Sequence, residues 1–151
     1  MKSITTYINE KLIVNKNTRA KNTRTKKIEI KYNYFPETKE ELRDILKKLI
    51  KERGNEGDFN DIDTSEITDM SSLFHNYIFS NFNGNISEWD VSNVENMRCM
   101  FFGCRSFNQN ISQWNVSNVE KMDNMFYECK SFNQPLDDWD VSKVEDMSSM
   151  F

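Results

Sequence analysis

Residues 107–131 read FNQNISQWNVSNVEKMDNMFYECKS. Residues 82–106 read FNGNISEWDVSNVENMRCMFFGCRS, and residues 132–151 read FNQPLDDWDVSKVEDMSSMF. The period is 25 residues, with no gap between units. The recurring positions include Phe82, Phe107 and Phe132; Trp89, Trp114 and Trp139; Val91, Val116 and Val141; and Met97, Met122 and Met147. This repeat predicts a stack of similar units, because one unit cannot bury its apolar residues alone.

The first half of each unit predicts a short strand. Ile111, Trp114 and Val116 follow the order apolar-x-x-apolar-x-apolar, which is the strand pattern of leucine-rich repeats. Trp114 and Val116 are two positions apart, so they would both point inward.

The second half of the unit predicts a helical or 3-10 turn, because its apolar residues lie three, three and one positions apart. These residues are Val119, Met122, Met125 and Phe126. Together the two halves predict an α/β solenoid, a leucine-rich-repeat-like array of short parallel strands and short helices or 3-10 turns.

Residues 36–57 predict a capping helix and a turn. The pattern Thr38-Lys-Glu-Glu41 is a capping box that opens a helix. One apolar face follows, made of Leu42, Ile45, Leu46, Leu49 and Ile50. We expect this helix to cover the N-terminal end of the stack, since terminal caps keep such arrays soluble.

The repeat region is assigned to residues 58–151. It opens with a degenerate unit in which ITDMSSLF, residues 67–74, matches the later units. A lengthened loop, HNYIFSN, then carries the single histidine, His75. The units are assigned as 58–81 (degenerate), 82–106, 107–131 and 132–151.

Residues 1–35 form a separate N-terminal segment with a basic arm and a predicted strand at 28–34. Residues 1–27 hold eight basic residues and one acidic residue, a net charge of about +7. The arm could attract nucleic acid or be a solvated lead-in to the fold. The basic residues that would contact phosphates are Lys16, Arg19, Lys21, Arg24, Lys26 and Lys27.

The composition argues against catalysis. Cys99, Cys104 and Cys129 lack zinc-ligand spacing, and one histidine cannot complete a metal site. No Gly-rich phosphate loop is present, and no apolar run reaches the ~18 residues of a membrane span. We therefore expect no enzyme activity, cofactor, metal site or membrane span, and we interpret the cysteines as buried thiols.

The repeat resembles the BspA-like leucine-rich-repeat family. The resemblance is carried by FNGNISEWDVSNVENM, FNQNISQWNVSNVEKM and FNQPLDDWDVSKVEDMSSMF and covers about residues 36–151. It implies a repeat protein of the kind found on bacterial surfaces or secreted, linked to adhesion and protein binding, with no catalytic residues.

We expect a protein-binding module that uses the outward face of its strands. Residues 54–151 hold 17 acidic and five basic residues, a net charge of about −12, so the protein partner should be basic or polar. The same side chains could equally serve only to keep the strands soluble. The predicted face consists of Glu88, Asp90 and Ser92; Gln113, Asn115 and Ser117; and Asp138, Asp140 and Ser142.

Two other expectations concern partners and compartment. A small intracellular inhibitor, of the kind a phage could encode, or a nucleic-acid mimic that occupies a basic groove is the alternative function. Residues 1–14 lack the uninterrupted apolar run of a secretory signal, so the chain as written is expected in the cytoplasm, whereas the resemblance alone implies the cell surface. The C-terminal end of the stack could pair with a partner, and the oligomeric state stays open.

Overall fold

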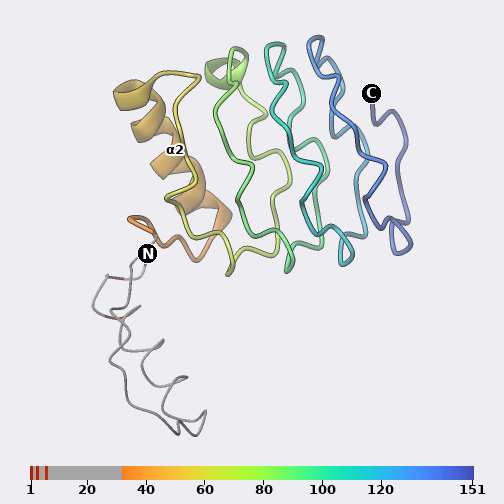
Figure 1. Ribbon diagram of the computed structural model, residues 1–151, viewed down its shortest axis with the longest axis horizontal. Coiled ribbons are helices and arrows are strands. Elements are labelled where there is room, and N and C mark those ends of the chain that lie inside the picture. The colour runs from red at the N-terminus through yellow and green to blue at the C-terminus, as the bar shows by residue number, and fades with distance from the viewer. Residues whose placement is uncertain (2, 4–5, 7–31) are drawn as a thin grey trace, which may run out of the picture.

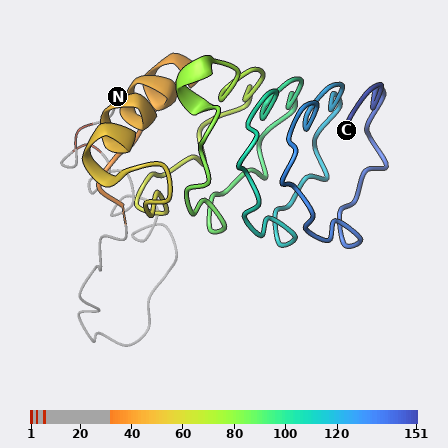
Figure 2. The same ribbon diagram turned by 90° about the horizontal axis from the view of Figure 1, so that it is seen from above.

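The computed structural model describes residues 1, 3, 6 and 32–151. Figure 1 shows helix α2 (Lys39–Arg53) at one end of the molecule, followed by coils that lie side by side up to the C-terminus. The view from above in Figure 2 shows the same order of helix and coils. A 3-10 turn, η1 (Tyr77–Phe79), lies in the lengthened loop. The basic arm and residues 28–31 of the predicted strand lie outside the described residues.

Helix α2 begins where the sequence predicts. The Oγ1 atom of Thr38 accepts a hydrogen bond from the Glu41 N–H at 3.2 Å, which satisfies one of the free donors of the first turn. Leu42, Leu46 and Leu49 have no exposed surface and pack into the same core as the coils. The helix therefore covers one end of the stack with its apolar face.

Basic side chains of α2 also hold it to the first coil. Lys39 pairs with Asp69 at 2.8 Å, and Arg53 pairs with Asp61 at 2.7 Å. The Arg53 guanidinium donates two hydrogen bonds to Asp61 and lowers the pKa of that carboxyl, because it stabilises the charged form. The helix thus attaches to the coils through both apolar and charged contacts.

The prediction of an α/β solenoid is wrong. Within residues 32–151, α2 and η1 are the only helices, and no run of described residues forms a strand. The coils consist of turns and irregular backbone joined by isolated parallel bridges. These bridges are Tyr34 to Ile62, Asp58 to Asn85, Asp69 to Asn96, Asn96 to Lys121, and Lys121 to Asp146.

Successive β-turns account for the spacing that predicted strands and helices. The Trp114 N–H donates to the Ile111 carbonyl at 3.1 Å. Equivalent hydrogen bonds join Val119 to Val116 at 2.9 Å and Met125 to Met122 at 3.2 Å. The apolar residues that close each turn are buried, whereas most of the polar residues between them are at least partly exposed. A spacing of three therefore marks the two ends of a β-turn in this chain.

A left-handed residue in every coil prevents a longer strand or helix. Ser72, Cys99, Asn124 and Ser149 have φ angles of 52°, 52°, 56° and 51°. They occupy the same position in successive coils. Both strands and right-handed helices need negative φ, so this position limits each stretch of parallel pairing to isolated bridges.

The recurring sequence Asx-x-Ser builds many of the turns. The Oδ1 atom of Asn115 accepts hydrogen bonds from the N–H of Ser117 at 3.2 Å and from its Oγ at 2.7 Å. Asp90 accepts the equivalent pair from Ser92 at 3.0 and 2.6 Å. Such contacts give the backbone a local alternative to a strand or helix ladder.

Each coil is also bonded to the coil before it through side chains at fixed positions. The Asn108 N–H donates to Oδ1 of Asn83, and the Asn133 N–H donates to Oδ1 of Asn108, both at 2.9 Å. The indole N–H of each tryptophan donates to a carbonyl of the preceding coil. These bonds run from Trp89 to Phe59 (3.0 Å), from Trp114 to Ile86 (3.2 Å) and from Trp139 to Ile111 (3.1 Å).

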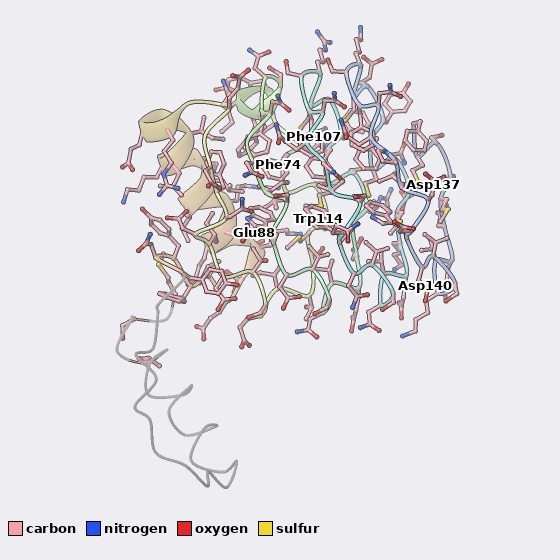
Figure 3. All side chains as sticks on the ribbon, viewed as in Figure 1. Phe74, Glu88, Phe107, Trp114, Asp137 and Asp140 are labelled. Atoms are coloured by element: carbon pink, nitrogen blue, oxygen red, sulfur yellow. The ribbon has the colours of Figure 1, made fainter. Side chains whose placement is uncertain are left out.

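The core is a set of aromatic and aliphatic rows along the stack. The rings of Trp89 and Trp114 are parallel with centroids 6.5 Å apart. Phe101 stacks on Phe107 with centroids 4.1 Å apart. Figure 3 shows Phe107 and Trp114 within the stack, and both are buried.

The last coil leaves exposed the apolar side chains that are buried at the equivalent positions of the preceding coil. Val141 and Met147 are 38% and 39% exposed, whereas the equivalent Val116 and Met122 are 1% and 0% exposed. The pairing of this end with a partner stays a prediction.

We expect Trp114→Phe to lower the free energy of unfolding by about 1–3 kcal/mol. The substitution removes the indole donor to the Ile86 carbonyl and part of a buried side chain. Urea denaturation followed by circular dichroism measures the change. Gln113→Ala, an exposed neighbour, should alter stability by less than about 0.5 kcal/mol. Equal effects of the two variants would show that the buried Trp114 ring and its hydrogen bond to the preceding coil do not stabilise the stack.

We expect Gly84→Ala to lower the free energy of unfolding by about 2–3 kcal/mol. A Cβ atom at Gly84 would lie 2.2 Å from the ring of Phe59 and 2.8 Å from that of Phe82. The control is Gly103→Ala, where a Cβ meets nothing within 4 Å but φ is +74°, a strain of about 1 kcal/mol. Urea titrations followed by tryptophan fluorescence should rank the variants in this order, and the reverse order would refute the packing argument.

Candidate functional site

The predicted binding residues stack in register on successive coils, but most of them also build the turns. Asp90 bonds to Ser92, Asn115 to Ser117, and Asp140 accepts the Ser142 N–H at 3.1 Å. The side chain and N–H of Ser142 lower the pKa of Asp140. Figure 3 shows Glu88 and Asp140, which mark this set of residues on an early and a late coil. The turns therefore use six of the nine predicted residues as hydrogen-bonding partners of one another.

A polar groove lies beside these turns. Its volume is about 410 Å³, and we call it the Glu95 groove. Six of its lining residues are Asn93, Glu95, Asn118, Glu120, Lys143 and Ser65. It crosses several coils, because equivalent residues of successive units line it.

One row of the Glu95 groove consists of amides that bond to the preceding coil. The Nδ2 atoms of Asn93 and Asn118 donate to the carbonyls of Ser65 and Ser92, each at 2.8 Å. Lys143 takes the equivalent position in the last unit, and its Nζ donates to Oδ1 of Asn118 at 2.7 Å. These bonds fix the amides in the wall of the groove.

The second row consists of glutamates, of which Glu95 and Glu120 line the groove and Glu145 continues the row on the last coil. The Glu120 N–H donates to the Glu95 carbonyl, and the Glu145 N–H donates to the Glu120 carbonyl, both at 2.8 Å. Backbone bonds therefore hold the three glutamates one coil apart, and all three are exposed. Within the described part of the chain, no ion pair is found for Glu95, Glu120 or Glu145. Adjacent like charges favour a cationic partner.

Sequence reasoning missed the Glu95 groove, although its pattern is present. VSNVE recurs at residues 91–95 and 116–120, and VSKVE follows at 141–145. An amide and a glutamate two positions apart would point to the same side of an extended chain. The predicted binding face instead consists of residues just before this pattern and of its serine, and six of those nine residues form the turns.

The His75 ring packs against Phe102 with centroids 4.5 Å apart. Within residues 1, 3, 6 and 32–151, no group of three His, Cys, Asp or Glu side chains is arranged to hold a metal. The same residues contain no helix long and apolar enough to cross a bilayer. The absence of enzyme activity stays a prediction.

The thiols of two cysteines contact backbone carbonyls of the preceding coil. The Cys104 thiol contacts the Phe74 carbonyl at 3.7 Å, and the Cys129 thiol contacts the Phe101 carbonyl at 2.9 Å. Burial raises the pKa of Cys129 to about 12 and raises that of Cys104 further. Since the thiolate is the reactive form, both groups should be poor nucleophiles in the folded protein. Cys104 is fully buried, whereas Cys99 and Cys129 are only partly buried, so the prediction of buried thiols is correct only for Cys104.

These features define a repeat protein whose stacked 25-residue units present rows of polar side chains. The chain belongs to the family described as "Mycoplasma protein of unknown function, DUF285", whose sequence model matches residues 41–151. The match spans part of α2 and all of the repeat units. No curated protein matches the chain. No solved structure matches it either.

We expect only Cys99 to react with a thiol reagent such as DTNB at pH 8 in the folded protein. The thiolate fractions of Cys104 and Cys129 are negligible there, because the pKa of each thiol is raised. Both should react after unfolding in urea. Counting thionitrobenzoate released before and after denaturation measures this, with Cys99→Ser as the matched control. Rapid reaction of all three thiols in the folded state would contradict the raised pKa values of Cys104 and Cys129.

Proposed function

We propose that the chain is a non-catalytic protein-binding module whose contact surface is the Glu95 groove together with the polar turns beside it. The observation that carries this proposal is the regular row of Glu95, Glu120 and Glu145, bonded one coil apart. A rigid row of like charges on exposed residues offers a partner several equivalent contacts at once. The partner should present a basic or polar surface of matching spacing.

The charge of the repeat region supports a basic partner. Residues 54–151 have a net charge of about −12, and such a field accelerates encounter with a cationic surface. The side-chain amides of Asn93 and Asn118 add hydrogen-bond donors and acceptors beside the carboxylates. Affinity should therefore fall as the salt concentration rises.

The finer family assignment is part of this proposal. The repeat pattern FNxxIxxWDVSNVxxM resembles BspA-like proteins, and that resemblance implies protein binding and adhesion at a bacterial surface. The alternative is an inhibitor or nucleic-acid mimic that fills the basic groove of an enzyme. The regular spacing of Glu95 and Glu120 favours this alternative over other non-adhesive functions, because it presents negative charge as a linear row.

The test is affinity capture from a lysate of the source cells with three baits: the wild-type chain, Glu95→Gln/Glu120→Gln, and Glu52→Gln. Glu52 is an exposed acidic residue of α2 and serves as the matched control. We expect a nuclease-resistant protein that the wild-type chain and Glu52→Gln retain and the double variant loses, by about tenfold or more in Kd once purified.

Retention of the same protein by the double variant would refute the Glu95 groove as the contact surface. Loss of all partners after nuclease treatment would refute the protein-binding module itself. Competition for the captured protein by duplex DNA would favour the mimic over the adhesin.

A further inference from the structure

A second hollow lies on a different part of the molecule, where the repeat pattern is broken. Phe74 and Phe82 are eight positions apart, whereas the equivalent Phe101 and Phe107 are six apart. The two additional residues belong to the loop that contains η1. The hollow has a volume of about 760 Å³, and we call it the Tyr77 hollow. Six of its lining residues are His75, Tyr77, Ser80, Phe102, Arg105 and Glu128.

The loop holds an aromatic ring in solvent. Phe79 is fully buried and packs edge-on against Phe74 with centroids 5.4 Å apart. The side chain of Asn76 caps η1 by accepting the Ile78 N–H at 3.3 Å. These contacts fix the turn, and Tyr77 at its start is 86% exposed. The stacking of the coils does not require an exposed tyrosine here, since the later units lack this insertion.

A row of partly exposed rings borders the Tyr77 hollow. His75 contacts Phe102 with centroids 4.5 Å apart, and Phe102 stacks on Tyr127 at 5.1 Å. Tyr127 is 40% exposed. Exposed tyrosine and other aromatic side chains next to a concavity are typical of protein-binding hot spots, where arginine is also enriched.

The charge at this edge is opposite to that of the Glu95 groove. Arg105 and Lys130 occupy the same position in adjacent coils, and the Ser131 N–H donates to the Arg105 carbonyl at 3.1 Å. Lys130 pairs with Glu128 at 3.8 Å and offsets its charge. In the part of the chain that the structure describes, no ion pair is found for Arg105. Two of the five basic residues of 54–151 therefore lie beside the aromatic row, and the Arg105 guanidinium is available to an external anion.

We propose that the Tyr77 hollow binds an acidic peptide segment of a protein partner. An apolar or aromatic side chain of that segment fills the hollow beside Tyr77 and Phe102, and an adjacent carboxylate pairs with Arg105. The contact is separate from the Glu95 groove and selects the opposite charge. It rests on the proposed function only in that the partner is a protein.

The test is selection of a random-peptide phage library on the wild-type chain. We expect the enriched peptides to combine acidic residues with an aromatic or large aliphatic residue. Tyr77→Ala and Arg105→Ala should each weaken the binding of a synthesised selected peptide by about tenfold. Both side chains are exposed, so the variants should fold, and circular dichroism confirms this. Lys121→Ala, which removes an exposed positive charge away from the hollow, should bind as the wild type does.

Three results would overturn the inference. Enrichment of basic peptides whose binding is lost in Glu95→Gln/Glu120→Gln but kept in Tyr77→Ala would support the Glu95 groove and reject the Tyr77 hollow. Enrichment no greater than on a Tyr77→Ala/Arg105→Ala double variant would also reject it. Binding of acidic peptides that survives in both single variants would show that another surface is responsible.

Discussion

The hydrogen bonds that pass from each coil to the one before it are the constraint on which the structure depends. Asn108 donates its N–H to the side chain of Asn83, and the Trp114 indole donates to the Ile86 carbonyl. Each kind of bond recurs with the 25-residue period, so together these bonds set the register of the whole stack. With the register fixed, Phe, Trp and Met meet their equivalents in the core. The same register places Glu95 and Glu120 one coil apart on the surface.

Much of the fold could be predicted from the sequence, and the predictions that were wrong failed for a physical reason. The start of α2 just after Thr38 could be predicted, because a side-chain cap at that position has a distinct sequence pattern. The inward direction of Trp114 and Val116 is also correct. The assignment of strands and helices failed because a β-turn, like a helix, brings residues three apart to one side. The turn could have been recognised from Asn115-Val-Ser117, since Asx followed by Ser two residues later is turn chemistry.

The candidate site was only partly predictable for the same reason. The sequence pattern predicts a binding face that includes Asp90 and Asn115, yet the side chains of these two residues close turns. The glutamates that do line a groove lie a few residues later in each unit. The Tyr77 hollow depends on an insertion whose conformation comes from the anchoring of Phe79 and the cap at Asn76. No periodic pattern contains that information.

The uniform period has a consequence at the level of the gene. Each coil finds its donors and acceptors in the coil before it, so duplication or loss of one 25-codon block would bring matched ladder partners together at the new junction. The row of glutamates would then lengthen or shorten by one carboxylate. A lineage could therefore adjust its binding strength in discrete steps through recombination, without a point mutation in the core. The insertion that contains Tyr77 occurs only in the first, degenerate unit after α2. It would therefore stay in that unit while the number of 25-residue units changed.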